Sequence, residues 1–310
     1  MAETKNIKFK HFLWIDINKP KHHDIEELSE TYRFHPLDSQ EALKKSHRSK
    51  IETRGSYTFI GLHFPVYDRI KQEIYEGEIK VFISKKFLIT VHHGELDSFD
   101  EFIHLFEISK PLRDKFSDGS PERLLYEILN RIYLSRFPMI DHLIIDCDSI
   151  EHAIFARREE RMISKILSLR RNITDFRKIM QVHKNVIRRM VHELKENHLF
   201  VMKKTDAYFE SLIDYTKEMW DTLENLKERI EALQQTNESQ ISLKMSGIMK
   251  MLTIISVMTF PLTLIAAIFG MNMVHGMPFV NNANGFWIVI LIMLGIITFM
   301  LSIFKWKKWF

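Results

Sequence analysis

The chain has 310 residues, of which 27% are charged and 45% are hydrophobic, and its formal net charge is +4. All 40 acidic residues lie at or before Glu238, whereas only five of the 44 basic residues come later. The positive excess therefore belongs to a hydrophobic C-terminal segment rather than to a basic folded surface, which excludes a nucleic-acid-binding protein.

The first part of the chain, 1–120, is expected to form a cytoplasmic α/β domain. The candidate strands are Lys8–Ile17, Tyr57–Val66 and Ile79–Val91. The last two are rich in β-branched and aromatic residues, as strands are. Asp24–Thr31 and Ser39–Lys45 are expected to be short helices, because each opens with a residue that can cap a helix. This part contains no Gly-rich phosphate loop, and residues 1–12 show no signal peptide.

The next two segments are expected to be helical, because 122–240 contains no glycine and a single proline. We expect a long helical arm over 121–204 and a stalk helix over 205–247 that continues into the first membrane helix. The two differ in charge: 157–204 has a net charge of +9, and 205–238 has a net charge of −6. This division suggests that the two helices pack together or present opposite faces to ions.

The stalk has the clearest hydrophobic periodicity in the chain. Residues alternating by three and four form a heptad seam: Phe209, Leu212, Thr216, Met219, Leu223, Leu226, Ile230 and Leu233. Such a seam is typical of a coiled coil. It predicts a stalk that associates with other copies of the chain.

Two long runs without a charge, 251–269 and 286–304, exclude a soluble protein. At about 1.5 Å per residue each run reaches about 28 Å, close to the hydrocarbon thickness of a bilayer. The alternative is a pair of buried core helices. We expect transmembrane helices over 248–270 and 286–304, an extracytoplasmic loop over 271–285, and a basic cytoplasmic tail over 305–310.

The lysines predict the topology. Lys244 and Lys250 precede the first run, further lysines follow the second, and the loop between the runs has no Lys or Arg. Positive-inside bias then places both termini in the cytoplasm, in a multi-pass protein of the cell membrane. Trp287 and Trp306 lie where interfacial aromatic residues are found.

A small, hydroxyl-rich stripe follows the three-four spacing through the first membrane helix. It consists of Ser242, Ser246, Met249, Thr253, Ser256, Phe260, Thr263, Ala267 and Gly270. This pattern fits a tight helix contact or a pore lining. Two helices per chain cannot enclose a pore, so a pore requires several chains. No acidic or basic residue lies in either run, which argues against a carboxylate proton relay.

Several motifs resemble those of CorA-type divalent-cation channels, the CorA and ZntB superfamily. Gly270-Met271-Asn272 stands at the outer end of the first C-terminal helix, as the signature of that family does. Other similar motifs are Pro261-Leu262-Thr263, Met277-Pro278, Lys305-Trp306-Lys307-Lys308-Trp309, Trp14-Ile15-Asp16, His35-Pro36-Leu37, Phe87-Leu88-Ile89-Thr90-Val91-His92, Leu124-Leu125-Tyr126 and Phe137-Pro138. The resemblance covers the whole chain.

The resemblance implies a funnel-shaped homopentamer that needs no cofactor and carries Mg²⁺, Co²⁺ or Ni²⁺ into the cell. The implied selectivity filter is Gly270, Met271 and Asn272, with Asn272 as its outer ring. The implied pore lining is Ser246, Met249, Thr253, Ser256, Phe260, Thr263 and Ala267, which decides between the two interpretations of the stripe in favour of a pore. The partners are then other copies of the chain, the lipid bilayer and divalent cations.

The resemblance also implies feedback, in which internal Mg²⁺ holds the pore closed partly through stalk carboxylates. Suitable groups are Asp206, Glu210, Asp214 and Glu218, which are spaced by four and stack on one helical face. The alternative is a face that is solvated or paired with the basic arm. Both interpretations stay open at this stage.

Three alternatives concern the function. The first is a ZntB-like Zn²⁺ transporter on the same fold. The loop has no acid where many magnesium-type members have Met-Pro-Glu-Leu, and Gly285-Phe286-Trp287 is similar to the zinc-transporting ZntB branch. His275 would add a soft metal ligand. A membrane-anchored coiled-coil scaffold would explain the seam but not the hydroxyl stripe. An enzyme is excluded, because none of the 15 histidines has the spacing of a zinc protease and the single cysteine, Cys147, excludes a Cys-based zinc site.

Overall fold

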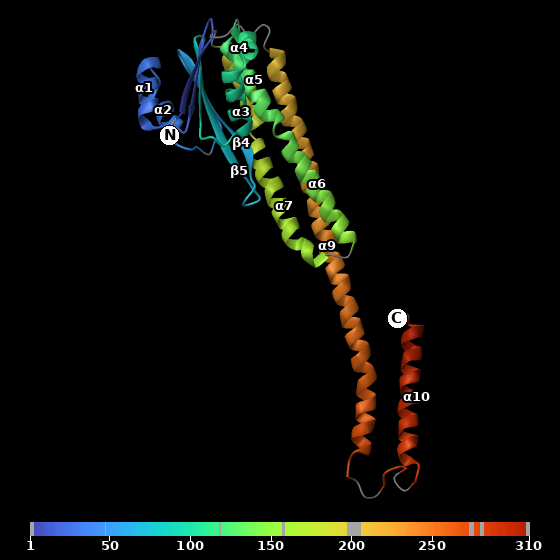
Figure 1. Ribbon diagram of the computed structural model, residues 1–310. Helices are drawn as coiled ribbons and strands as arrows, with labels where there is room; N and C mark the ends of the chain where they lie inside the picture. The colour runs from blue at the N-terminus through green and yellow to red at the C-terminus, as the bar shows by residue number, and fades with distance from the viewer. Residues whose placement is uncertain are drawn as a thin grey trace. The chain divides into compact units, whose positions relative to one another are not determined.

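The structure is a computed structural model that describes residues 3–46, 48–117, 119–156, 159–196, 206–272, 276–279 and 282–307. The chain divides into two compact units, 1–235 and 236–310. The long helix α9 (Asp206–Phe269) begins in the first unit and ends in the second (Figure 1).

A six-stranded sheet forms the centre of the first unit. Its strands are β1 (Glu3–Lys8), β2 (Leu13–Asn18), β3 (Lys50–Arg54), β4 (Tyr57–Asp68), β5 (Glu73–Ile83) and β6 (Phe87–His92). They lie in the order β1-β2-β6-β5-β4-β3. The β2–β6 pair is parallel and the others are antiparallel.

Two of the expected strands proved to be composite. The range Lys8–Ile17 contains a turn closed by the Phe9 N–H to the Phe12 carbonyl at 2.9 Å, so it holds the end of one strand and most of the next. A second turn, closed by Ser84 and Phe87 at 2.9 Å, separates β5 from β6 within Ile79–Val91. The hydrophobic runs continue through both turns, which is why the sequence pattern did not separate the strands.

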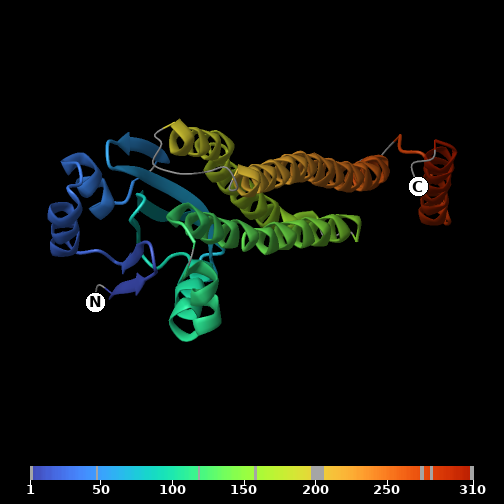
Figure 2. The ribbon, with the colours of Figure 1, turned by 90° about the horizontal axis from the view of Figure 1, so that it is seen from above.

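Both faces of the sheet are covered, so β4 and β5 are buried along most of their length. One face packs against α1 (His22–Tyr32) and α2 (Pro36–Leu43), with Phe34 stacked on Phe82 at 4.1 Å between ring centroids. The other face packs against the remaining helices of the unit. Figures 1 and 2 show α1 and α2 on one side of the strands and the green and yellow helices on the other.

The remaining helices of this unit follow the sheet along the chain. They are α3 (Asp97–Ile108), α4 (Lys110–Ser117), α5 (Pro121–Leu134), α6 (Phe137–Phe155), α7 (Glu159–Met180) and α8 (His183–Glu196). The expected helical arm is thus made of several separate helices. Helix α3 was not expected from the sequence, although Phe99, Phe102 and Phe106 mark its buried face.

The heptad seam of the stalk is buried inside its own chain, and this corrects the expectation that it joins different copies. All eight seam residues are buried, and its seven apolar members belong to the main hydrophobic core. For example, the ring of Phe209 packs edge to face against the ring of Tyr126 on α5, with 5.9 Å between the ring centroids. The same three-four spacing serves packing within or between chains, so the periodicity could not distinguish the two.

Arginines tie the stalk to the arm. Arg177 of α7 pairs with Glu224 of α9, and its guanidinium lies 4.9 Å from the ring of Trp220. Arg229 of α9 donates to Asp148 of α6 at 2.7 Å. The Arg177–Glu224 pair shows the basic segment packed against the acidic stalk, the first of the two arrangements that their charges suggested. The Arg229–Asp148 pair joins a stalk base to an acid of α6, outside that segment.

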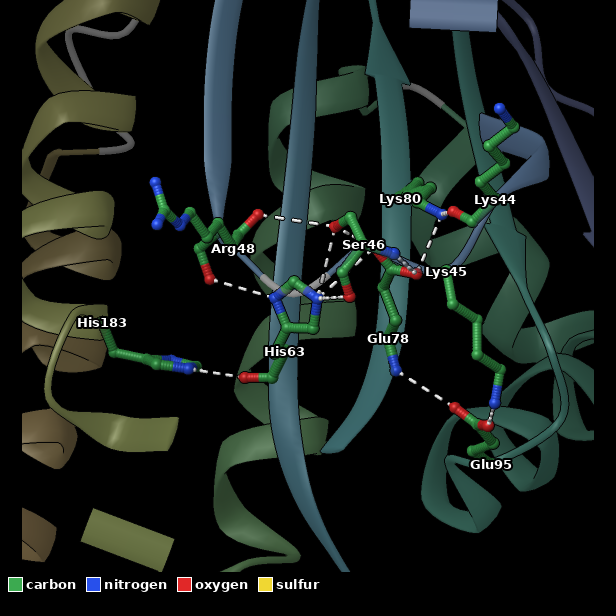
Figure 3. Close-up of polar contacts among 10 residues, drawn as sticks. Lys44, Lys45, Ser46, Arg48, His63, Glu78, Lys80, Glu95 and His183 are labelled. Atoms are coloured by element: carbon green, nitrogen blue, oxygen red, sulfur yellow. Dashed lines mark hydrogen bonds and ion pairs between the residues drawn. The ribbon is translucent and has the colours of Figure 1, made fainter. Parts of the chain in front are cut away.

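A buried polar network joins the sheet to the segment before β3 and to α8 (Figure 3). Glu78 accepts hydrogen bonds from Ser46 Oγ at 2.6 Å and Lys80 Nζ at 2.8 Å. Burial disfavours the ionised Glu78 carboxylate, but hydrogen bonds from His63, Lys80 and Ser46 outweigh burial and lower its pKa to about 2. On the far side of β4, the His183 ring lies 2.6 Å from the His63 carbonyl oxygen.

The second unit consists of the C-terminal part of α9, a loop, and α10 (Gly285–Trp306). Both helices are long and apolar enough to cross a membrane, and their apolar stretches are almost entirely exposed in the single chain. Exposure of such surface to water is unfavourable, by about 25 cal/mol per Å². Lipid or other copies of the chain must therefore cover it.

Candidate ion pathway

The expected pore stripe lies on the face of α9 that the rest of the chain leaves open. All of its residues from Ser246 to Gly270 are exposed, including Phe260 at 73%. The more shielded positions of this part of α9 are Ile254, Met258, Pro261, Leu262, Ile265 and Phe269. At about 100° per residue, the centres of the two stripes lie about 170° apart around the helix. The structure thus separates a face directed into the chain from a face that carries the hydroxyls.

The two threonines of the stripe donate their hydroxyl protons to carbonyls of their own helix. Thr253 Oγ1 donates its proton to the Met249 carbonyl at 2.8 Å, and Thr263 Oγ1 donates to the Thr259 carbonyl at 3.0 Å. A hydroxyl whose proton is used in this way keeps its lone pairs for a hydrated cation. The stripe can therefore present neutral oxygen ligands, the type that Mg²⁺ prefers.

The helix ends where the Gly-Met-Asn motif begins. The Gly270 N–H donates to the Ala266 carbonyl at 2.9 Å, and the Met271 N–H donates to the Ile268 carbonyl at 3.3 Å. Asn272 follows outside the helix and is exposed. An exposed amide at the end of the stripe is available to an ion or to its water shell. His275, the candidate soft ligand, lies outside the described residues.

The return from the loop into α10 depends on Gly285. A Cβ at this position would lie 2.2 Å from the Phe279 carbonyl oxygen. Phe279 itself has φ of 69°, an unusual value for a residue with a side chain. The Gly285 N–H donates to the Asn282 carbonyl at 2.9 Å and completes the turn. In the sequence, Gly285 stands out only as part of a family motif, because its steric role depends on a chain path that no local pattern encodes.

Replacing Gly285 by alanine should therefore destabilise the loop and the start of α10. The obstructing atom belongs to the backbone, so relief requires a backbone shift, and we expect a cost of about 1–3 kcal/mol. The measurement is the thermal unfolding midpoint in detergent. Gly295→Ala is the matched control, because its added methyl group meets nothing within 4 Å. Equal midpoints for the two variants would show that the contact is unimportant.

The groove between the loop ends of α9 and α10 is not an ion path. It has a volume of about 500 Å³, and aromatic side chains of Phe269, Phe279 and Phe286 line it together with mostly apolar residues and a single amide, that of Asn282. Apolar walls cannot replace the water shell of a divalent cation. The neutral oxygens lie instead on the opposite face of α9.

The stalk acids whose side chains the structure describes form no metal site within one chain. Glu210, Asp214 and Glu218 are exposed, and the described part of the chain offers them no ion-pair partner. The side chain of Asp206 lies outside the described residues. Among the described residues, no group of three or more His, Cys, Asp or Glu side chains could hold a metal ion. Any metal on this face must therefore find further ligands elsewhere, such as on another copy.

The chain is similar to known proteins over nearly its whole length. Residues 9–308 match the family described as CorA-like Mg²⁺ transporter protein. The cobalt/magnesium transport protein CorA of Thermotoga maritima is 27% identical over 298 residues, covering 96% of this chain and 83% of the relative.

Solved structures agree with this match. The complete structure of the CorA magnesium transporter from Methanocaldococcus jannaschii has a TM-score of 0.81 at 25% identity, covering 98% of this chain and 94% of that one. The ZntB cytoplasmic domain from Vibrio parahaemolyticus has a TM-score of 0.57 at 12% identity, covering 76% of this chain and 89% of that one. The second likeness concerns the fold alone.

Proposed function

The chain belongs to the CorA-like Mg²⁺ transporter family, and from this premise we propose that it conducts Mg²⁺ into the cell through a pore lined by α9. As a member of this family the chain is a divalent-cation transporter of a membrane and not an enzyme. The observation that carries the proposal is the open face of α9, where hydroxyl oxygens follow one stripe that ends at Asn272.

The pore requires several copies, because one chain supplies a single lining helix. We propose a homopentamer, as the resemblance implies. The exposed membrane helices support an assembly, since the stripe and the flanks of α9 have no cover within the described part of the chain. The stalk seam is not available for contacts between copies, because the chain buries it internally.

The mechanism follows from the chemistry of the stripe. Mg²⁺ loses its water reluctantly, so a ring of Asn272 amide oxygens would bind the hydrated ion through its water. The hydroxyls of Thr263, Ser256 and Thr253 would then accept hydrogen bonds from that water along the pore. A divalent ion that enters a negative interior gains about 4.6 kcal/mol per 100 mV, twice the single-charge figure, so the potential can drive transport.

The ion is proposed to be Mg²⁺, with Co²⁺ and Ni²⁺ as further substrates. The neutral oxygen ligands favour a hard cation over Zn²⁺, which prefers nitrogen and sulfur. A ZntB-like zinc transporter is the second candidate, favoured by the acid-free loop. Competition in an uptake assay separates the two: excess Mg²⁺ should block Co²⁺ entry, whereas a block by Zn²⁺ alone would select the zinc transporter.

Both termini are proposed to lie in the cytoplasm, with the loop outside, because the lysines flank the two helices away from the loop. Single cysteines at Val274 and Ser117, in a Cys147→Ser background, test this topology. An impermeant thiol reagent applied to intact cells should label position 274 and not 117. The reverse labelling would contradict the topology.

A further inference from the structure

A cavity of about 610 Å³ lies in the first unit, where the corner between α5 and α6 meets the start of α3. The ends of β4 and β5 that face each other, part of α6 and one residue of α7 form the rest of its wall. All of these residues belong to the first unit. Cavities of this size commonly hold small molecules.

Arg136 is fixed at the corner between α5 and α6. Its N–H donates to the Tyr133 carbonyl at 2.9 Å, and its own carbonyl accepts from the Met139 N–H at 3.1 Å. The Oγ of Ser135, the residue before it, lies 2.9 Å from the Oγ of Ser98 on α3. The guanidinium of Arg136 is therefore presented to the cavity from a frame of three helices, as a preorganised binding group should be.

The guanidinium of Arg136 is buried, yet one edge of it has no partner. The residue is 6% exposed, and neither Nε nor Nη2 has a hydrogen-bond partner among the described residues. Its Nη1 lies 3.8 Å from the sulfur of Met139, a weak acceptor. Burial lowers the pKa of Arg136 to about 10, against the charge of Asp97, so the group stays charged at neutral pH. A buried charge without a partner is unfavourable, which calls for an anion in the cavity.

The open edge is the one that binds a carboxylate side-on. Arg54 shows this arrangement elsewhere in the chain, where its Nε and Nη2 donate to the two oxygens of Asp38 at 3.1 and 3.3 Å. Two parallel N–H groups match the two oxygens of a planar anion. Arg136 offers the same two nitrogens, and no described side chain occupies them.

Acidic side chains on the same cavity call for a cation as well. Asp97, Glu101 and Asp146 line it, all three are exposed, and no ion pair to them forms within the described part of the chain. With Glu95, four acids face the cavity against two arginines. This excess of negative charge would repel a phosphate or another dianion. A metal ion fits poorly too, because no described group of three such side chains could hold one.

We propose that this cavity binds a small zwitterion, a molecule with one carboxylate and one cationic amine, as in an amino acid. The carboxylate lies on the Nε and Nη2 edge of Arg136, and the amine faces the acids of Asp97, Glu101 and Asp146. Such a ligand supplies both of the missing charges and adds no net charge to the cavity. The site shares no residue with the pore stripe or the stalk acids, so it stands apart from the transport proposal.

The test uses the full-length protein in detergent, titrated with glycine, 4-aminobutyrate or 6-aminohexanoate while the thermal unfolding midpoint is recorded. At least one of the three should raise the midpoint saturably. The carboxylic acid and the amine of the same chain length should each bind about tenfold more weakly, because each leaves one of the two charges unmet. No shift with any of the three, or equal affinity for the plain carboxylate, would overturn the proposal.

Arg136→Met should abolish the response to the aminocarboxylate. Methionine replaces an unpaired buried charge by an apolar side chain, so the midpoint of the ligand-free protein should not fall. A wild-type response in this variant would overturn the proposal.

A second variant leaves Arg136 in place and changes exposed side chains alone: Asp97→Asn/Glu101→Gln/Asp146→Asn. Its preference for the aminocarboxylate over the plain carboxylate should shrink from about tenfold to about twofold or less, since the amine loses its partners. An unchanged preference would contradict the placement of the amine.

The matched control removes three exposed acids of the same unit that do not line the cavity: Glu27→Gln/Glu30→Gln/Asp141→Asn. It should keep the wild-type preference. If the control loses the preference as well, the effect belongs to the overall charge of the unit, and the proposal fails.

Discussion

Saturable uptake of divalent cations should disappear when Asn272 is replaced by alanine. Asn272 is the amide that directly follows the open stripe of α9, and it is exposed at the end of the helix. In an assembly, one amide oxygen from each copy would form a ring around the axis. A methyl group offers no hydrogen bond to the water of a hydrated ion.

The expected effect of Asn272→Ala is large because each copy loses its ligand at once. A net hydrogen bond contributes about 0.5–1.5 kcal/mol, so the loss of even two corresponds to about fivefold to 150-fold in affinity. Oligomer size and membrane insertion should stay unchanged, since the amide takes no part in the helix. Uptake by Asn272→Ala with an unchanged apparent affinity would remove Asn272 from the filter.

Asn284→Ala is the matched control for this change. Asn284 is a second exposed loop amide, at the start of α10, and its side chain does not cap that helix. Its replacement removes the same chemical group from the far end of the loop. We expect wild-type uptake from Asn284→Ala.

The second large effect concerns feedback by internal Mg²⁺ through the stalk. We propose that cations bridge the carboxylates of Asp206, Glu210, Asp214 and Glu218 to neighbouring copies and so favour the closed arrangement. The exposure of Glu210, Asp214 and Glu218, and their lack of an ion pair in the described chain, support this role over pairing with the basic arm. By contrast, Glu224 of the same helix pairs with Arg177.

Neutralising Asp206, Glu210 and Asp214 to Asn, Gln and Asn should raise flux several-fold at millimolar internal Mg²⁺. A ligand shifts a two-state equilibrium only through its different affinity for the two states. A shift from 1:99 to 99:1 requires about 5.5 kcal/mol, which several weak sites can supply together. The same variant should lose much of the protection from protease that Mg²⁺ gives the cytoplasmic domain.

Glu228→Gln controls for the loss of negative charge on this helix. Glu228 is also exposed, but it does not belong to the row of acids from Asp206 to Glu218. It should behave as the wild type in both assays. Wild-type inhibition and protection in the triple variant would show that this face does not regulate the channel.

The membrane segment was the most predictable part of the fold. An uncharged apolar run long enough to span a bilayer has few alternatives, and the Gly-Met-Asn signature marked the end of α9 at the position where the structure places it. The stripe from Ser246 to Gly270 was identified from spacing alone. Its separation from the shielded face around Ile254 needed the structure, because the position of α10 is not encoded in a local pattern.

Tertiary packing decided what the sequence left ambiguous. The periodicity of Phe209 and its successors is equally compatible with contacts between chains and with burial under α5, and only the fold shows the second. In the sheet, the short turn at Ser84 contains no glycine or proline to mark it. The requirement for glycine at position 285 arises from the approach of the Phe279 carbonyl, a contact between two ends of a loop.

Ion flux into liposomes that contain only the purified protein tests the central claim most directly. With a negative interior potential and Mg²⁺ outside, we expect saturable Mg²⁺ entry that needs no ATP, stops when the potential is removed and the gradient is levelled, and is lost in Asn272→Ala. Liposomes that carry the wild-type protein but take up no more Mg²⁺ than protein-free liposomes would contradict the account.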